Sequence, residues 1–169
     1  MPNNNSSKES NKRFYTSGNE IPAAAAEKAF SCDLARFRTA QRSSWSCALS
    51  EIKSGRKRSH WMWFIFPQIE GLGYSDTARY YAIRNLEEAR AYLKDPVLGG
   101  RLREISEALL QLDTDDPTQV FGYPDDLKLK SSMTLFEKAG EGTSDAELFG
   151  KVLEKYFRGQ RDHHTLERI

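Results

Sequence analysis

The spacing of apolar residues constrains the fold of this chain more than any other feature, because it follows the helical period from residue 34 onward. In the first such segment the stripe recurs at steps of three and four residues, which keeps it on one face of an α-helix. Asp33 is typical of a helix N-cap and Gly55 of a helix end, so we predict a helix between them. Its stripe consists of Leu34, Phe37, Gln41, Trp45, Ala48 and Ile52.

Capping residues divide the middle of the chain into further helices. Ser75 predicts a short helix that continues to Ile83, and Asn85 predicts another over residues 86–94. Asp95-Pro96 then begins a longer helix, because proline is well suited to the first helical position. The apolar stripe of this longer helix consists of Leu98, Leu102, Ile105, Leu109 and Leu112.

Three more helices and a last turn are predicted toward the C-terminus. They are expected at residues 116–122, at residues 124–138, after residue 144 and from residue 162. Their start signals are, in chain order, Asp116-Pro117, Pro124, Ser144 and Asp162.

No segment alternates with period two for long, and no internal repeat occurs. We therefore predict an all-α, compact orthogonal bundle of about six to eight helices. One short apolar stretch, Ser59 to Gln68, is ambiguous, because periodicity does not separate a short buried helix from a buried strand. Ser59 as a cap and Pro67 as a stop favour a short helix there.

The first 32 residues differ from the rest of the chain. They are polar and poor in aliphatic residues, and Pro2, Gly18 and Pro22 interrupt any periodicity. Burial would not offset the entropy lost on ordering such a segment, so we predict a disordered N-terminal arm over residues 1–32. Residues 33–169 are long enough for one hydrophobic core and are expected to form a single helical domain.

Composition argues against several classes of protein. Lys and Arg number 25 against 24 acids, a balance that argues against nucleic acid as a partner. The chain lacks an apolar run of the roughly 20 residues that span a bilayer, so no membrane partner is expected. Two cysteines, Cys32 and Cys47, favour a reducing compartment, and the cytoplasm is the predicted location. No pattern indicates the oligomeric state.

The same residues argue against a metal or another cofactor. His60 is the one imidazole in the central part of the chain, since His163 and His164 lie near the C-terminus. A zinc site requires three or four ligands at regular spacing, and no such cluster occurs in the sequence. We therefore predict no metal and no cofactor.

The aromatic segment is the first candidate for chemistry. Trp61 or Trp63 could stack on a base while Arg58 holds a phosphate, and His60 could transfer a proton near neutral pH. The alternative is structural: the rings belong to the core, the basic run Arg56-Lys57-Arg58 is a solvated face, and His60 is a satisfied core residue.

The helix after Pro124 is the second candidate, because polar residues lie beside its apolar stripe. An inward carboxylate without a partner is costly, so it either caps the helix or meets a cation or a ligand. In the functional interpretation this helix forms a wall of a polar cavity through Asp125, Asp126, Lys128, Ser131 and Ser132. Gln68 and Arg101 are expected to face the same cavity. In the alternative interpretation, the side-chain amides of Gln41 and Gln68 form hydrogen bonds only with one another or with loop carbonyl groups.

These motifs together resemble an uncharacterised family, domain of unknown function 1810, from about Asp33 to the C-terminus. The resemblance implies a mainly helical fold and no established reaction. Many members of this family also carry the label "calpastatin". A protease inhibitor of that kind would be a long disordered chain of repeats, and this sequence has neither property beyond its arm. Many members have His where this chain has Asp95. The motifs are residues 59–68, Gly71-Leu72-Gly73, Phe121-Gly122, residues 125–128 and residues 131–136.

A fainter resemblance, carried by Asp125, Lys128 and Ser132-Met133, is to the NADAR group of ADP-ribose-linked proteins. That group is helical and is similar to hydrolases of glycosidic bonds, so it implies an enzyme of that class.

The leading hypothesis is a helical domain that binds a phosphate-bearing small molecule, a nucleotide or an ADP-ribose derivative, and hydrolyses an N-glycosidic bond. In it, Asp125 or Asp126 stabilises positive charge on the sugar, Lys128 and Arg58 hold phosphate, and His60 moves a proton. One rival is a non-catalytic protein-interaction module. A second rival is single-stranded nucleic-acid binding through the basic turn at residues 56–58.

Overall fold

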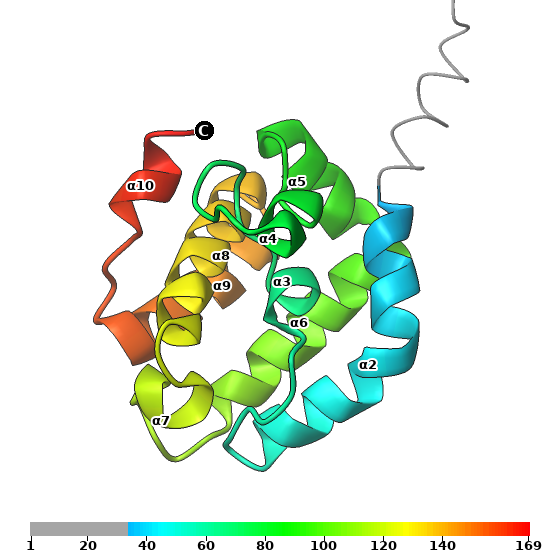
Figure 1. Ribbon diagram of the computed structural model, residues 1–169. Helices are drawn as coiled ribbons and strands as arrows, with labels where there is room; N and C mark the ends of the chain where they lie inside the picture. Colours follow the sequence, from blue (N-terminus) through cyan, green and yellow to red (C-terminus); the bar gives the residue numbers. More distant parts are fainter. Residues whose placement is uncertain (1–33) are drawn as a thin grey trace, which may run out of the picture. The chain divides into compact units, whose positions relative to one another are not determined.

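Helices make up the regular structure of residues 34–169, the part of the chain that this computed structural model describes (Figure 1). The all-α prediction is confirmed. Nine helices are present in these residues, more than the predicted six to eight, because several are single turns. They are α2 (Ala35–Lys53), α3 (Met62–Ile65), α4 (Asp76–Tyr80), α5 (Leu86–Lys94), α6 (Pro96–Leu110), α7 (Pro117–Phe121), α8 (Asp125–Ala139), α9 (Ser144–Phe157) and α10 (His163–Leu166). The predicted arm at residues 1–32 and the predicted cap at Asp33 lie outside the described residues.

Most predicted caps form the expected hydrogen bonds. The side chains of Asn85, Asp95 and Asp116 each accept from backbone N–H groups in the first turn of their helix. Ser75 and Asp162 do the same for α4 and α10. Each of these bonds satisfies a donor that a helix start would otherwise leave unpaired.

Three local predictions were wrong. Thr143 rather than Ser144 caps α9, because the Thr143 hydroxyl accepts from the Asp145 N–H. Ser59 does not cap α3, which begins three residues later without a side-chain cap. The helix after Ser75 ends at Tyr80 instead of Ile83, because Ile83 exchanges backbone hydrogen bonds with the extended residues at 68–70.

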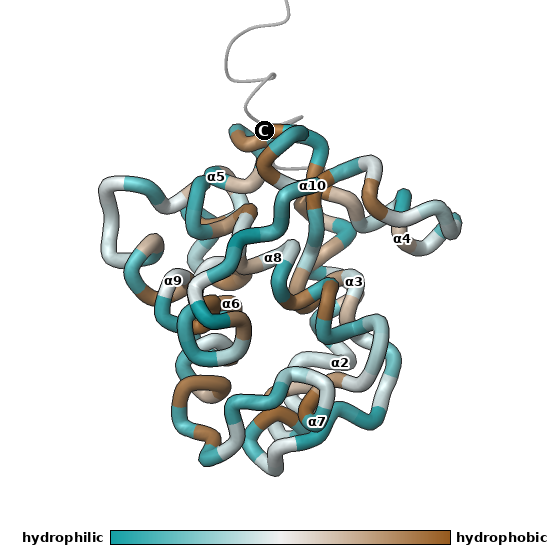
Figure 2. The backbone as a smooth tube through the Cα atoms, turned by 90° about the vertical axis from the view of Figure 1, so that its left-hand side faces the viewer, coloured by the Kyte–Doolittle hydropathy of each residue, from teal (hydrophilic) through white to brown (hydrophobic). Residues whose placement is uncertain are grey.

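A chain of contacting aromatic rings runs through the core and connects four helices. Phe37 of α2 contacts Tyr92 of α5 edge to face at 5.2 Å between centroids. Tyr92 contacts Phe136 of α8 at 5.1 Å, and Phe136 contacts Phe149 of α9 at 6.1 Å. All four rings are buried. Brown and teal alternate along the long helices in Figure 2, as expected where one face of each helix is buried.

Helix α8 lies at the centre of this packing. It packs against α9 and α5, and it also contacts α7 and α10. Helix α6 packs against α2, α5 and α9. Because α8 touches so many elements, side chains on several of its faces are removed from water, including those of Ser131, Ser132 and Thr134.

A buried carboxylate fixes the turn that leads into the aromatic segment. Glu51 accepts hydrogen bonds from the Trp61 indole at 2.8 Å and from the Arg58 N–H at 2.7 Å. Burial acts to raise the pKa of Glu51, but the hydrogen bonds from Trp61, Arg58 and Ser59 outweigh it and lower the pKa below its ordinary value of 4.5. Nothing in the sequence pattern had singled out Glu51.

We predict that Glu51→Gln destabilises the fold by about 1–3 kcal/mol at pH 7, since it removes a charge that accepts two hydrogen bonds in the interior. Because the folded-state pKa of Glu51 is lowered, its ionisation stabilises the native state above pH 4.5 and less as the pH falls below that value. Chemical denaturation at several pH values measures both effects. If the Glu51→Gln variant lost as much stability as the parent protein when the pH falls below 4.5, Glu51 would not be the group responsible for this pH dependence.

Candidate functional site

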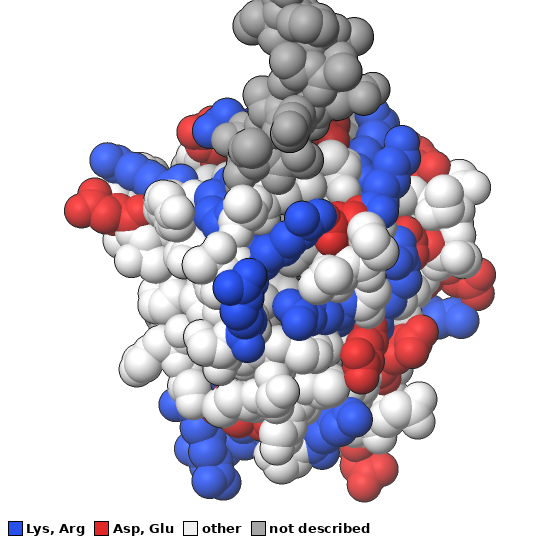
Figure 3. Space-filling model, turned by 90° about the vertical axis from the view of Figure 1, so that its right-hand side faces the viewer, with Lys and Arg blue, Asp and Glu red and all other residues white. Residues whose placement is uncertain are grey.

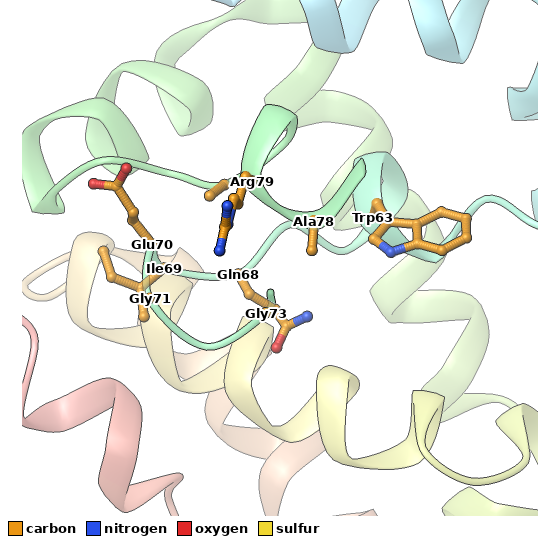
Figure 4. Close-up of a pocket in the computed structure, with 9 residues that line it drawn as sticks. Trp63, Gln68, Ile69, Glu70, Gly71, Gly73, Ala78 and Arg79 are labelled. Carbon is orange, nitrogen blue, oxygen red and sulfur yellow. The ribbon is translucent and has the colours of Figure 1, made fainter. Parts of the chain in front are cut away.

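Two neighbouring cavities share Gln68, Gly73 and Ala78 in their walls, and together we call them the groove. The larger measures about 410 Å³ and the smaller about 20 Å³. The larger is lined by Gln68, Leu72, Gly73, Ala78, Pro124, Leu127, Lys128, Lys130, Ser131, Asp162 and His164. The smaller is lined by Trp63, Gln68, Ile69, Glu70, Gly71, Gly73, Ala78, Arg79 and Ala82 (Figure 4).

The loop at residues 68–73 forms the wall common to both cavities. The N–H of Ile83 donates to the Gln68 carbonyl, and the N–H of Glu70 donates to the Ile83 carbonyl, each at 2.8 Å. A Cβ on Gly73 would lie 2.5 Å from the Ala78 Cβ, so only glycine lets the loop approach α4 this closely. In Figure 4, Trp63 and Glu70 lie toward opposite ends of this region, and Gln68 and Gly73 lie between them.

Asp125 pairs with two lysines at the edge of the groove. One carboxylate oxygen lies 2.9 Å from the Lys57 ammonium, and the other lies 3.2 Å from that of Lys128. Lys57 lies over the Trp61 ring and Lys128 over the Trp63 ring, each at 5.1 Å from the centroid. Together the two lysines and the carboxylate carry a net charge of +1 at neutral pH.

The C-terminal turn completes the larger cavity. The Thr134 hydroxyl on α8 donates to the Lys130 carbonyl at 2.8 Å and accepts from the Asp162 N–H at 2.9 Å. This contact places Asp162 and His164 beside the exposed edge of α8. Asp162 in turn caps α10 by accepting from Thr165.

Four residues predicted from the sequence come together in the groove. Lys128, Ser131 and Gln68 line the larger cavity, and Gln68 also lines the smaller one with Trp63. Ser131 donates its hydroxyl to the Leu127 carbonyl at 3.1 Å. The two tryptophans face different ways, since Trp61 is only 1% exposed and belongs to the core whereas Trp63 is partly exposed.

The remaining predicted residues lie elsewhere. His60 and Arg58 are exposed and line neither cavity. Asp126 is buried and accepts from the Thr118 hydroxyl at 2.9 Å, so it joins α7 to α8. Ser132 is buried, and its hydroxyl has no hydrogen-bond partner among the described residues.

Arg101 of α6 contacts residues of α2 and lines neither cavity of the groove. Its guanidinium is 3.4 Å from the Gln41 side-chain oxygen. Gln41 donates to the Phe64 carbonyl at 2.7 Å and to the Tyr92 hydroxyl at 3.0 Å, so this buried amide finds partners within the fold. Burial raises the pKa of Tyr92, so its hydroxyl stays protonated at physiological pH.

Sequence reasoning missed several groove residues. The sequence pattern gives no site signal for Lys130, Asp162 or His164, which line the larger cavity, nor for Lys57, which pairs with Asp125 outside the cavity lining. No local signal identifies them, because α10 reaches the groove only through its contact with Thr134.

A third cavity, of about 450 Å³, lies where the α5–α6 junction meets the loop before α9. Arg103 in its wall binds the Asp145 carboxylate through two bonds at 2.6 and 2.9 Å and the Leu93 carbonyl at 2.8 Å. Asp95, Arg103 and Asp145 in its wall are thus paired within the fold, and this cavity contains none of the site residues predicted from the sequence, so the groove is the stronger candidate. Residues 34–169 contain no cluster of three or more side chains able to hold a metal ion. No helix in this part of the chain is long and apolar enough to cross a membrane.

Comparison with known proteins identifies the family. The family described as a protein of unknown function (DUF1810) matches residues 31–169, and the chain belongs to it. The crystal structure of the conserved hypothetical protein Rv1873 from Mycobacterium tuberculosis is 46% identical, with a TM-score of 0.76 over 80% of this chain and 94% of that chain. No curated protein matches this chain. The resemblance to the family is confirmed, and similarity to the NADAR group stays a prediction.

We predict that Asp125→Asn lowers the free energy of unfolding by about 1–3 kcal/mol, because it leaves the largely buried Lys57 ammonium without its carboxylate. Denaturant titration of both proteins measures the difference. The matched control is Glu147→Gln, which removes an exposed ion pair with Lys151 and is expected to cost less than about 0.5 kcal/mol. Equal effects of the two substitutions would show that Asp125 has no special structural role.

Proposed function

We propose that this protein binds a phosphate-bearing small molecule, of the nucleotide or ADP-ribose kind, in the groove. The larger cavity has the volume of typical small-molecule sites. Its wall combines the lysines Lys128 and Lys130 with the imidazole of His164, and Asp162 is the acidic residue that lines it. This excess of nitrogen donors favours an anionic ligand.

The position of Lys128 is the observation that carries this proposal. Its ammonium lies over the Trp63 ring and beside Asp125, so its place at the cavity is set before a ligand arrives. Asp125 is shared with Lys57, which leaves one positive charge of the three groups uncompensated. A fixed cation with incomplete pairing binds phosphate at a small entropic cost.

The two cavities suggest how such a ligand is oriented. The smaller one holds about one water-sized group, so the bulk of the ligand occupies the larger cavity. Leu72, Pro124 and Leu127 supply an apolar wall there for a flat ring. In this arrangement Trp63 acts by holding Lys128 and does not cover the base.

A thermal-shift screen with nucleotides and ADP-ribose derivatives tests the proposal. A ligand at a hundredfold excess over its Kd is expected to add about 2.7 kcal/mol to the free energy of unfolding. Lys128→Ala is expected to weaken binding about tenfold or more, since it removes a charge-assisted contact. The matched control is Lys138→Ala, an exposed lysine on the same helix, which should bind as the parent does. Equal binding by both variants would contradict the proposal.

Hydrolysis of an N-glycosidic bond is the reaction that we propose for the bound ligand. Asp162 lines the larger cavity, and its Oδ2 accepts from Thr165 while its Oδ1 has no hydrogen-bond partner among residues 34–169. Asp125, by contrast, is paired with two lysines and Asp126 is bonded to Thr118. Chromatographic detection of released base, with Asp162→Asn beside the parent, tests this step. We expect at least a hundredfold slower release by the variant, in the range typical of general acid–base groups. If the parent protein binds the ligand but releases no base, the hydrolysis proposal is wrong and only the binding proposal stands.

A protein-interaction module is the second candidate, and exposed apolar residues beside the groove favour it. Tyr74 follows Gly73 and is 81% exposed, Tyr123 precedes Pro124 and is 78% exposed, and Leu127 is half exposed. Clustering of such side chains beside a cavity is typical of a contact surface for another protein. If no small molecule stabilises the protein in the thermal-shift screen, the protein-interaction function is favoured.

A further inference from the structure

Arg101 occupies a polar setting that the proposed groove does not use. Its guanidinium carbon lies 5.6 Å from the centroid of the Trp45 ring, and one of its nitrogens is 3.4 Å from the Gln41 oxygen. Gln41 is held by Phe64 and Tyr92, so the side chain that contacts Arg101 is itself fixed. Arg101 is thereby positioned at the surface between α2 and α6.

Two further arginines of α2 border the same region. At about 100° per residue, Arg38, Arg42 and Trp45 fall within an arc of about 60° on α2. Arg38 forms an ion pair with Asp95, the N-cap of α6, and Trp45 contacts Arg101 further along α6. We call Arg38, Arg42, Trp45 and Arg101 the α2–α6 seam. Figure 3 shows Lys and Arg side chains gathered on the side of the molecule where α2 lies.

The seam retains positive charge that the fold does not neutralise. Asp95 pairs with Arg38, but Arg42 and Arg101 have no carboxylate within ion-pair distance among residues 34–169. Glu104 is exposed one turn after Arg101 and forms no ion pair with it. Trp45 is partly exposed, so a flat ring and two uncompensated guanidinium groups share one surface.

We propose that the α2–α6 seam binds single-stranded nucleic acid, with phosphates on Arg42 and Arg101 and a base on the Trp45 ring. The seam residues line none of the cavities described above, and an open surface suits an extended strand better than a compact small molecule. The flat Trp45 ring beside the guanidinium groups can stack on a base, whereas an acidic peptide offers no such plane. The balanced net charge of the chain does not oppose this, because the positive charge is local.

Fluorescence anisotropy with a labelled single strand of about ten nucleotides, read at several salt concentrations, tests the proposal. We expect saturable binding that Arg42→Ala and Arg101→Ala each weaken about tenfold. Each substitution is also expected to reduce the salt slope by about 0.7. Trp45→Ala should weaken binding without changing that slope, because it removes stacking and not charge. Arg42 is exposed, so its variant tests the seam even if Arg101→Ala disturbs folding.

Lys53→Ala and Arg56→Ala are the matched controls, because both residues are exposed cations near the end of α2 and outside the seam. They should bind the strand as the parent does. Absence of saturable binding at low salt, equal weakening by the controls, or equally effective competition by polyglutamate would overturn the proposal. The groove is tested separately through Lys128 with small ligands, so either proposal can fail while the other stands.

Discussion

The ion pairs of Asp125 connect the two distant segments on which the groove depends. Lys57 belongs to the turn before α3 and its side chain is 8% exposed, whereas Asp125 begins α8. An ammonium group this deeply buried is costly without a partner, so the turn and the start of α8 stabilise each other. Glu51 reinforces the turn from the other side through Trp61 and Arg58. The positions of Lys128 and Trp63 at the groove follow from this arrangement.

Helix α8 combines core packing with a polar edge. Leu129, Met133 and Phe136 are fully buried, while polar groups beside them form bonds to other elements. Asp126 binds Thr118 of α7, and Thr134 accepts from the Asp162 backbone before α10. The inward polar residues of this helix thus hold neighbouring segments in place, and two of those segments carry groove residues.

Membership in a family of unknown function supplies a shared fold but no reaction, and a fold alone does not define a function. The functional argument therefore depends on the charges of particular sites. The groove offers partly neutralised lysines around a cavity, which suits a compact anion. The α2–α6 seam offers arginines and a ring on an open surface, which suits an extended one. The two surfaces differ in shape more than in charge.

The sequence by itself determined the helices, because caps and apolar spacing act within a few residues. Asn85, Asp95 and Asp116 each accept hydrogen bonds from backbone N–H groups in the first turn of their own helix. Their effect is therefore local and can be recognised from the sequence. The sequence also predicted one polar cavity for Lys128, Gln68 and Ser131, which line one cavity in the structure, whereas Asp126, Ser132 and Arg101, predicted with them, do not. Only the tertiary structure decided that Trp61 is buried while Trp63 reaches the groove, and that His164 joins it. Those outcomes depend on which distant element covers each face, and packing between elements leaves no local pattern in the chain.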